Sequence, residues 1–195
     1  PSNITLTRRH VEHLDPYREQ GFRTTSNNRD AVRESDIIIL AVEPQQLNAL
    51  LTEIGPELDT DRHLVISVVS GVSIRQILKV LDKEVALVRA VPNTAIAIRE
   101  SITCLATNRT DGNSVKSARA IFDTVGETIV LSEEQMLSAT AVVACGIAFF
   151  LRAIRAASQG GIEIGFHFAD ALFIAAQTAK GAASLVLSME NHPEY

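Results

Sequence analysis

The sequence predicts an α/β fold in which a mostly parallel sheet is followed by a domain built only from helices. Short apolar runs alternate with amphipathic segments as far as Leu131, and polar or glycine-containing turns separate them. From Ser132 onward only helical patterns remain. Repeated strand and helix at this spacing favours parallel strands joined by right-handed crossovers. We therefore expect two domains, 1–131 and 132–195.

The clearest strand is the run at 37–42, which is apolar at every position and so is typical of a strand buried on both faces. Pro44 follows where the first turn of a helix tolerates proline, and Ser73 is placed to cap a later helix. We expect strands over 3–7, 37–42, 64–69, 86–91, 101–106 and 127–131, and helices over 29–34, 45–54, 73–81 and 114–125. A short helix or turn is expected over 16–21.

Two long helices are expected in the C-terminal domain. Ser132 and Gln135 form a capping-box pattern that opens a helix of about 25 residues. The second helix, over 169–189, is rich in alanine and apolar on most faces. Because helices of this kind need neighbours on every side, we expect the domain to pack against another copy of the chain as a homo-oligomer, most simply a homodimer.

Composition narrows the possible partners. The chain has 195 residues, is 46% hydrophobic and carries a net charge of −5, which favours neither nucleic acid nor an anionic membrane surface. The longest uncharged apolar run, 137–151, stops at Arg152 and is too short to cross a bilayer. Cys104 and Cys145 lack metal-ligand spacing. We expect buried thiols in a reducing, cytoplasmic compartment, no bound metal, and a small-molecule partner.

The ends of the predicted strands are the positions where chemistry is expected. In a doubly wound sheet, ligands bind outside the carboxyl ends of the strands. These ends are 7–9, 41–45, 68–71 and 91–94, and each is a polar or backbone-exposing turn that follows an apolar strand. Ordinary turns would also have this composition, so the pattern alone leaves both interpretations open.

Two arginines follow the first of these strands. A dinucleotide-binding sheet that prefers NAD usually carries a carboxylate at the end of its second strand, where it binds the ribose 2′-hydroxyl. Here Thr7 is followed by Arg8 and Arg9. If 3–7 is that second strand, the guanidinium groups match a 2′-phosphate, which predicts NADPH as the preferred cofactor. A solvated surface turn is the alternative.

The glycine fingerprint of dinucleotide-binding sheets does not occur at the expected place in this sequence. It should lie about one strand–helix unit upstream of 3–7. The only glycine cluster, Gly160–Gly161 with Gly165, follows a helix and is interpreted as a helix stop. We therefore expect the first strand and its glycine loop to precede Pro1, and the chain to continue past Tyr195.

Several motifs, in a fixed order, resemble the pyrroline-5-carboxylate reductase family. AVEPQQ at 41–46, SVVSGVSI at 67–74 and RAVPNTAIAI at 89–98 resemble its AVKPQ, AAGVT and MPNTP signatures. AAQTAKGAASLVL at 175–187, followed by NHPE at 191–194, resembles its AAQTxxGAAxLL and HPxxL segments. The resemblance extends over nearly the whole chain, and several motifs in succession are more specific than any one of them.

This resemblance implies a Rossmann-type dinucleotide-binding domain followed by a helical dimerisation domain. It implies reduction of 1-pyrroline-5-carboxylate to L-proline, the last step of proline biosynthesis, with NADPH or NADH and without a metal. It leaves the catalytic proton donor unassigned. The site residues it implies are Thr7, Arg8 and Arg9 at the adenosine ribose and phosphate, Asn28 near the adenine, Ala41, Val42 and Pro44 along the dinucleotide, and Ser70, Asn93 and Thr94 near the nicotinamide and imine.

The sequence also departs from the family pattern. Glu43 stands where the family often has lysine, 143–149 reads VACGIAF rather than SGSGPAY, and Arg155 occupies a position that is often glutamate. The family's TSPGGTT-like loop, which supplies donors for the substrate carboxylate, would follow Tyr195. A divergent branch of the family, or an altered imine substrate, would account for these departures.

Two other functions remain open at this point. A dehydrogenase of the 3-hydroxyacid or 6-phosphogluconate type shares the domain order, but it needs a catalytic lysine on the long helix, and none occurs between Leu131 and Ala179. A non-catalytic dimeric scaffold or ligand sensor is the other. Glu133 and Glu134 are interpreted as favourable charges at the N-terminus of their own helix.

Overall fold

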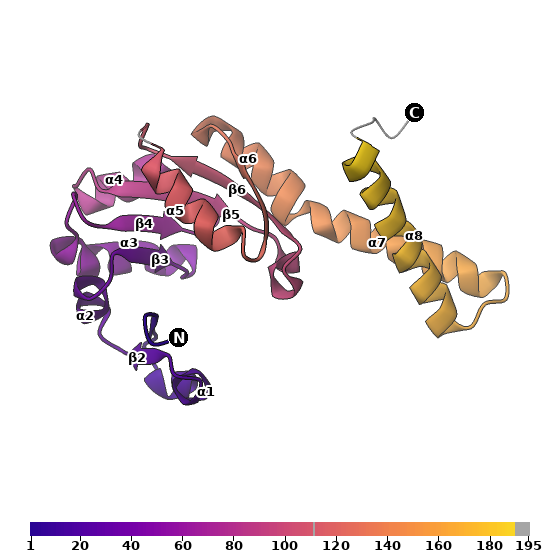
Figure 1. Cartoon of the computed structure of the whole chain (residues 1–195), viewed down its shortest axis with the longest axis horizontal. Coiled ribbons are helices and arrows are strands. Elements are labelled where there is room, and N and C mark those ends of the chain that lie inside the picture. The colour runs from indigo at the N-terminus through magenta and orange to yellow at the C-terminus, as the bar shows by residue number, and fades with distance from the viewer. Residues whose placement is uncertain (111, 190–195) are drawn as a thin grey trace. The chain divides into compact units, whose positions relative to one another are not determined.

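The computed structural model describes residues 1–110 and 112–189. The chain forms two compact units, Pro1–Ala144 and Cys145–Tyr195. The first unit contains all of the strands described, and the second contains a pair of helices (Figure 1). The predicted order of an α/β part followed by a helical part is therefore confirmed.

The chain begins with a small two-stranded parallel sheet of β1 (Thr5–Thr7) and β2 (Arg23–Thr25). Between these strands lie η1 (Val11–Leu14) and α1 (Asp15–Glu19), and α2 (Asn28–Arg33) follows them. Strand β2 was not predicted, because its three residues, Arg-Thr-Thr, show no apolar alternation.

The main sheet has five strands, in the order β3 (Ile37–Leu40), β4 (Leu64–Ser67), β5 (Ala86–Val91), β6 (Ser101–Thr107) and β7 (Gly126–Val130). Strands β3, β4 and β5 run parallel, β6 is antiparallel to β5, and β7 is parallel to β6. Strand β6 reverses because only a short 3₁₀ helix, η3 (Thr94–Ile98), joins it to β5. A parallel pairing would need a longer crossover.

Helices cover both faces of this sheet (Figure 1). On one face, α3 (Pro44–Ile54), followed by η2 (Gly55–Glu57), and α4 (Ile74–Leu81) bury their apolar stripes in the larger core cluster. On the other face, α5 (Asn113–Phe122) packs through Ala118 and Phe122 against residues of β4, β5 and β6. The predicted helices occupy nearly the predicted ranges, because each carries its apolar residues at helical spacing.

Strand β3 is less buried than its sequence predicts. Ile38 and Leu40 pack into the larger core, whereas Ile37 is 39% exposed and Ile39 is 48% exposed. The reason is positional: β3 is the edge strand of the five-stranded sheet, and α5 covers β4, β5 and β6 on this face without reaching it.

The first unit continues beyond the boundary predicted near Leu131. The segment η4 (Glu133–Gln135), α6 (Met136–Ala139) and the π-helical η5 (Thr140–Ala144) belongs to it. Met136, Ala139 and Val143 are buried in the larger core cluster, which holds the segment on the sheet. The predicted capping box is present, because the Ser132 N–H donates to Gln135 Oε1 at 3.1 Å.

The second unit is a hairpin of α7 (Gly146–Glu163) and α8 (Phe168–Met189). Gly160 and Gly161 were expected to end α7, but both lie inside it. Gly165 follows the helix in a left-handed conformation, with φ of 110°. At Gly161 the two helices approach closely, since a Cβ there would lie 3.1 Å from Ala171 Cβ.

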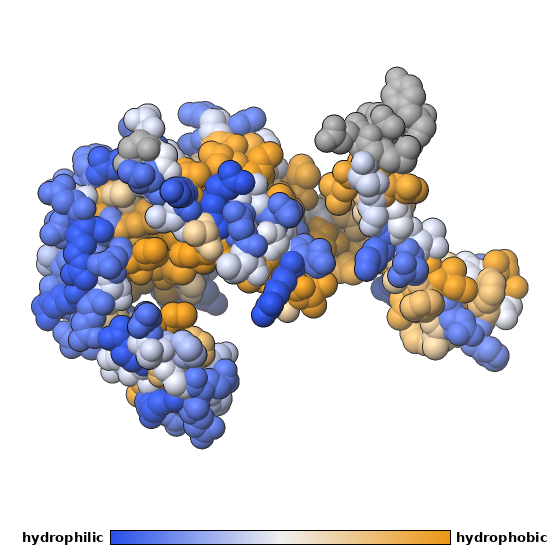
Figure 2. All heavy atoms as spheres, viewed as in Figure 1, coloured by the Kyte–Doolittle hydropathy of each residue, from blue (hydrophilic) through white to orange (hydrophobic). Residues whose placement is uncertain are grey.

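Large apolar side chains are exposed along both helices (Figure 2). Phe149, Phe150, Phe173 and Leu187 are each at least 70% exposed. By length and composition, the helices over 133–163 and 168–188 could also cross a membrane, although the run at 137–151 was predicted to be too short. Exposure on this scale indicates a surface that another apolar surface covers.

The two cysteines differ in environment. Cys104 is buried on β6, and this burial raises the pKa of its thiol. Cys145 was expected to be buried as well, but it is exposed just before the start of α7. Both are free cysteines, as predicted.

We predict opposite roles for the two neighbouring glycines of α7. Alanine at Gly160 meets open space and should stabilise the helix by up to about 1 kcal/mol. Alanine at Gly161 crowds Ala171, so Gly161→Ala should be less stable than Gly160→Ala by about 1 kcal/mol or more. Urea unfolding of the two variants measures this difference, and equal stabilisation by both would disprove the close approach.

Candidate functional site

The three parallel strands of the main sheet end at a common edge. Leu40 is in register with Ser67, and the Val68 N–H extends the pairing by donating to the Leu40 carbonyl at 3.0 Å. Strand β5 runs in the same direction and ends at Val91. The turns after β3, β4 and β5 therefore lie along one edge, which brings together three of the four strand ends singled out in the sequence.

The first turn connects β3 to α3. Pro44 occupies the first turn of α3, as predicted, and Glu43 precedes it without a side-chain cap hydrogen bond. Ala41 and Pro44 are exposed, while Val42 is half-buried and packs against the larger core. Ala41 and Pro44 are thus available to a ligand at the edge, and Val42 anchors the turn while part of its surface stays exposed.

The second turn connects β4 to α4. Behind it, the buried Ser67 Oγ accepts from the Val69 N–H at 3.3 Å. Ahead of it, Ser73 caps α4 as predicted, with its Oγ accepting from the Gln76 N–H at 3.3 Å. Gly71 adopts φ of 75°, the left-handed region that glycine tolerates. Ser70 is exposed, and its hydroxyl has no hydrogen-bond partner among the described residues.

The third turn follows β5 and presents Asn93 and Thr94. The Asn93 side chain caps η3, with Oδ1 accepting from the Ala95 N–H at 3.0 Å. Because a backbone N–H can only donate, the atom that meets it must be the carboxamide oxygen. Asn93 Nδ2 is then left to donate toward a ligand, and within the described part of the chain it has no acceptor. The hydroxyl-bearing Thr94 is exposed beside it.

A buried serine supports this third turn and was not predicted. Ser101 Oγ accepts from the Asn93 N–H at 3.2 Å and donates to the Ile102 carbonyl at 3.2 Å. Gly126 of β7 packs against the Ser101 backbone so closely that a Cβ there would clash with it. Nothing in the local pattern around Ser101 distinguishes it from any serine at the start of a strand.

The predicted arginine pair directly follows β1 of the separate two-stranded sheet. The Arg8 N–H donates to the Thr25 carbonyl at 3.3 Å, which fixes the backbone after β1. Thr7, Arg8 and Arg9 are exposed, and among the described residues neither guanidinium forms a hydrogen bond or ion pair. Arg18 and Arg23, in the same part of the chain, are paired with carboxylates at 2.8 and 3.0 Å.

Asn28 does not face the strand ends freely. Its Nδ2 donates to Glu53 Oε2 at 3.1 Å, which ties the start of α2 to α3. The cap of α2 is the preceding residue, Asn27, whose Oδ1 accepts from the Arg29 and Asp30 N–H groups. In the structure, the Asn28 side chain therefore links α2 to α3.

Comparison with known proteins identifies the family. Residues 133–195 match the family model for pyrroline-5-carboxylate reductase dimerisation, and residues 1–71 match that for coenzyme F420-dependent NADP oxidoreductases. The solved pyrroline-5-carboxylate reductase of Coxiella burnetii is 32% identical, with a TM-score of 0.91, over 97% of this chain and 72% of that one. This chain belongs to the pyrroline-5-carboxylate reductase family.

Two further members of the pyrroline-5-carboxylate reductase family are also similar to this chain. Pyrroline-5-carboxylate reductase 1 of Dictyostelium discoideum is 49% identical over 100% of this chain, which spans 37% of that protein's length. The NADP-bound reductase of Plasmodium falciparum has a TM-score of 0.81 at 25% identity, over 89% of this chain and 66% of that one. The motif resemblance is confirmed, and the hydroxyacid-dehydrogenase alternative is set aside. The NHPE motif at 191–194 lies outside the described residues.

We predict that Ser101→Ala lowers the free energy of unfolding by about 1–2 kcal/mol, because the Asn93 N–H loses its acceptor. The control is Thr103→Val on the same strand. Thr103 is fully buried, and its hydroxyl has no partner among the described residues, so valine should be neutral or stabilising. Chemical denaturation compares the two, and similar losses would argue against a specific role for Ser101.

Proposed function

We propose that this protein reduces 1-pyrroline-5-carboxylate to L-proline with NADPH as the preferred cofactor, and that NADH can replace it. Membership of the pyrroline-5-carboxylate reductase family supports this proposal. The observation that carries it is the convergence of three polar turns, after β3, β4 and β5, on one edge of a parallel sheet. Dinucleotides bind at such an edge in sheets of this class.

The residues at this edge and after β1 fit a phosphorylated dinucleotide. Arg8 and Arg9 present exposed guanidinium groups without protein partners among the described residues, which suits a 2′-phosphate. Thr7 adds a hydroxyl to them. We assign Asn28 to the adenine side. Ala41, Val42, Pro44 and Ser70 would line the dinucleotide along the sheet edge.

When bound, NADPH supplies the hydride that reduces the imine carbon. The protein's part is to orient the reactants and exclude water. Asn93 Nδ2 is held ready to donate because its carboxamide oxygen is engaged by Ala95. Ser70 and Thr94 offer exposed hydroxyl groups from the turns after β4 and β5. These groups hold the nicotinamide and imine in place, and we assign none of them as the proton donor.

We further propose that two copies of the chain pack through α7 and α8. The match of residues 133–195 to a dimerisation family supports this assignment. A second copy would cover the exposed phenylalanines and leucines of both helices, which also explains why these helices are apolar enough to cross a membrane. We also propose that the enzyme is cytoplasmic and that its substrate is a small imine. We expect it to bind neither membranes nor nucleic acid.

The direct test is a turnover assay. Purified protein is supplied with NADPH and 1-pyrroline-5-carboxylate, and both cofactor oxidation and proline formation are followed. Oxidation that requires the imine and yields proline in equal amount supports the proposal. Protein that is folded and oligomeric but neither binds NADPH nor makes proline would instead be the non-catalytic scaffold or sensor.

We predict that Arg8→Ala/Arg9→Ala weakens NADPH binding by more than about 1.5 kcal/mol, the scale of a charge-assisted contact, and leaves NADH binding nearly unchanged. Arg18→Ala is the control, because it removes an exposed arginine that is already paired with Asp15. Titration calorimetry with both cofactors measures the effect. Equal losses for NADPH and NADH would refute the phosphate-binding role.

A further inference from the structure

An arginine is buried inside the main sheet's core. Arg89 lies on β5, and its side chain is only 6% exposed. Its neighbours at alternate positions, Leu87 and Val91, belong to the larger core cluster, so all three share one face of the strand. A charge in such surroundings is costly unless it is paired.

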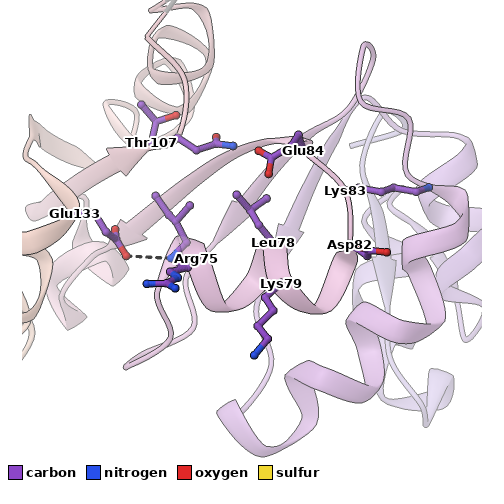
Figure 3. A pocket seen from close by; sticks show the side chains of 10 residues that line it. Arg75, Leu78, Lys79, Asp82, Lys83, Glu84, Thr107 and Glu133 are labelled. Carbon is purple, nitrogen blue, oxygen red and sulfur yellow. Dashed lines mark hydrogen bonds between the residues drawn. The ribbon is translucent and has the colours of Figure 1, made fainter.

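The partner of Arg89 is Glu133, 44 residues away along the chain. Arg89 Nη1 donates to Glu133 Oε1 at 3.2 Å. The same oxygen accepts from the N–H of Ile74, the first residue of α4, at 3.0 Å. Figure 3 shows the Glu133 carboxylate reaching the start of α4. The sequence predicts Glu133 as a favourable charge at the N-terminus of its own helix. In the structure its carboxylate instead bonds to Arg89 of β5 and to Ile74 of α4.

The hydrogen bonding of this ion pair is incomplete, so the pair contributes less to stability than a fully satisfied one would. Arg89 Nε and Glu133 Oε2 are both buried and have no hydrogen-bond partner among the described residues. A bidentate pair would satisfy both atoms. Instead, one carboxylate oxygen is shared between two donors on different elements. Because buried pairs seldom improve stability over apolar packing, the sharing needs another explanation.

The two donors adjoin the two turns assigned to the nicotinamide and imine. Ile74 begins the helix that directly follows the Ser70 turn. Arg89 stands near the end of β5, which leads into Asn93. Arg89 is also in register with Ser67, whose Oγ holds the start of the Ser70 turn. The Glu133 carboxylate therefore links the start of α4, after the Ser70 turn, to β5, before the Asn93 turn.

We propose that Glu133 is a positioning residue, whose carboxylate fixes the turn after β4 relative to the turn after β5 and so aligns nicotinamide with imine. Glu133 touches neither reactant in this role. The proposal rests on the proposed reductase function. If Glu133 is lost, the two turns should shift relative to each other, and this should slow hydride transfer more than it weakens cofactor binding. Cofactor affinity should change little, because Arg8 and Arg9 are proposed to bind the other end of the dinucleotide.

The test compares Glu133→Ala with Glu133→Gln in the turnover assay. Alanine removes both contacts, so kcat should fall by about tenfold or more, while the dissociation constant of NADPH changes less than about twofold. Glutamine keeps an acceptor oxygen for Ile74 and Arg89, and it should restore most of kcat. Glu134→Ala is the control, because the neighbouring Glu134 is exposed, and it should leave kcat unchanged.

A purely structural role would give a different result. Both Glu133 variants would lose thermal stability, while kcat per folded active site stayed at the wild-type value, and this would overturn the proposal. Amide hydrogen exchange without substrate separates this question from the reaction itself. In Glu133→Ala, exchange should speed up at both 70–74 and 90–94, even if the wild-type protein were to turn over no imine. Faster exchange at only one turn, or at neither, would refute the link.

Discussion

The parallel pairing of β3, β4 and β5 is the constraint on which the site depends. Because the strands run in one direction, their carboxyl ends share one edge of the sheet. The turns that follow these strands must therefore begin at that edge. Core burial keeps the register, because Val65 and Leu87 are fully buried in the larger core cluster, on the face of the sheet that α3 and α4 cover. The positions of Ser70 and Asn93 thus follow from how the core is packed.

The turns after β4 and β5 are also supported from behind by buried polar groups. Ser67 holds the turn after β4, and Ser101 holds the turn after β5. The carboxylate of Glu133 accepts from Ile74, which follows the first turn, and from Arg89, which precedes the second. Because these buried neighbours fix the backbone of both turns, Ser70 and Asn93 keep donors that no described residue engages. A site assembled in this way can orient two reactants with little movement of the protein.

Local patterns predicted most of this fold. Apolar spacing, the proline of α3 and the serine cap of α4 are properties of neighbouring residues, so β3, α3, β4, α4 and β5 could be placed from sequence. Contacts between distant residues could not be. The Arg89–Glu133 pair, the Ser101–Asn93 contact and the close approach at Gly161 depend on tertiary packing. The exposure of Ile39 likewise follows from which strand lies at the sheet edge.

The most direct measurement is amide hydrogen exchange of the whole protein with and without NADP⁺. If the three turns form one dinucleotide site, the amides at 41–46, 68–73 and 93–96 should be protected together at saturating cofactor, along with those at 7–9. Protection that is confined to a single turn, or binding of NADP⁺ with no protection at these turns, would contradict the account of a common edge.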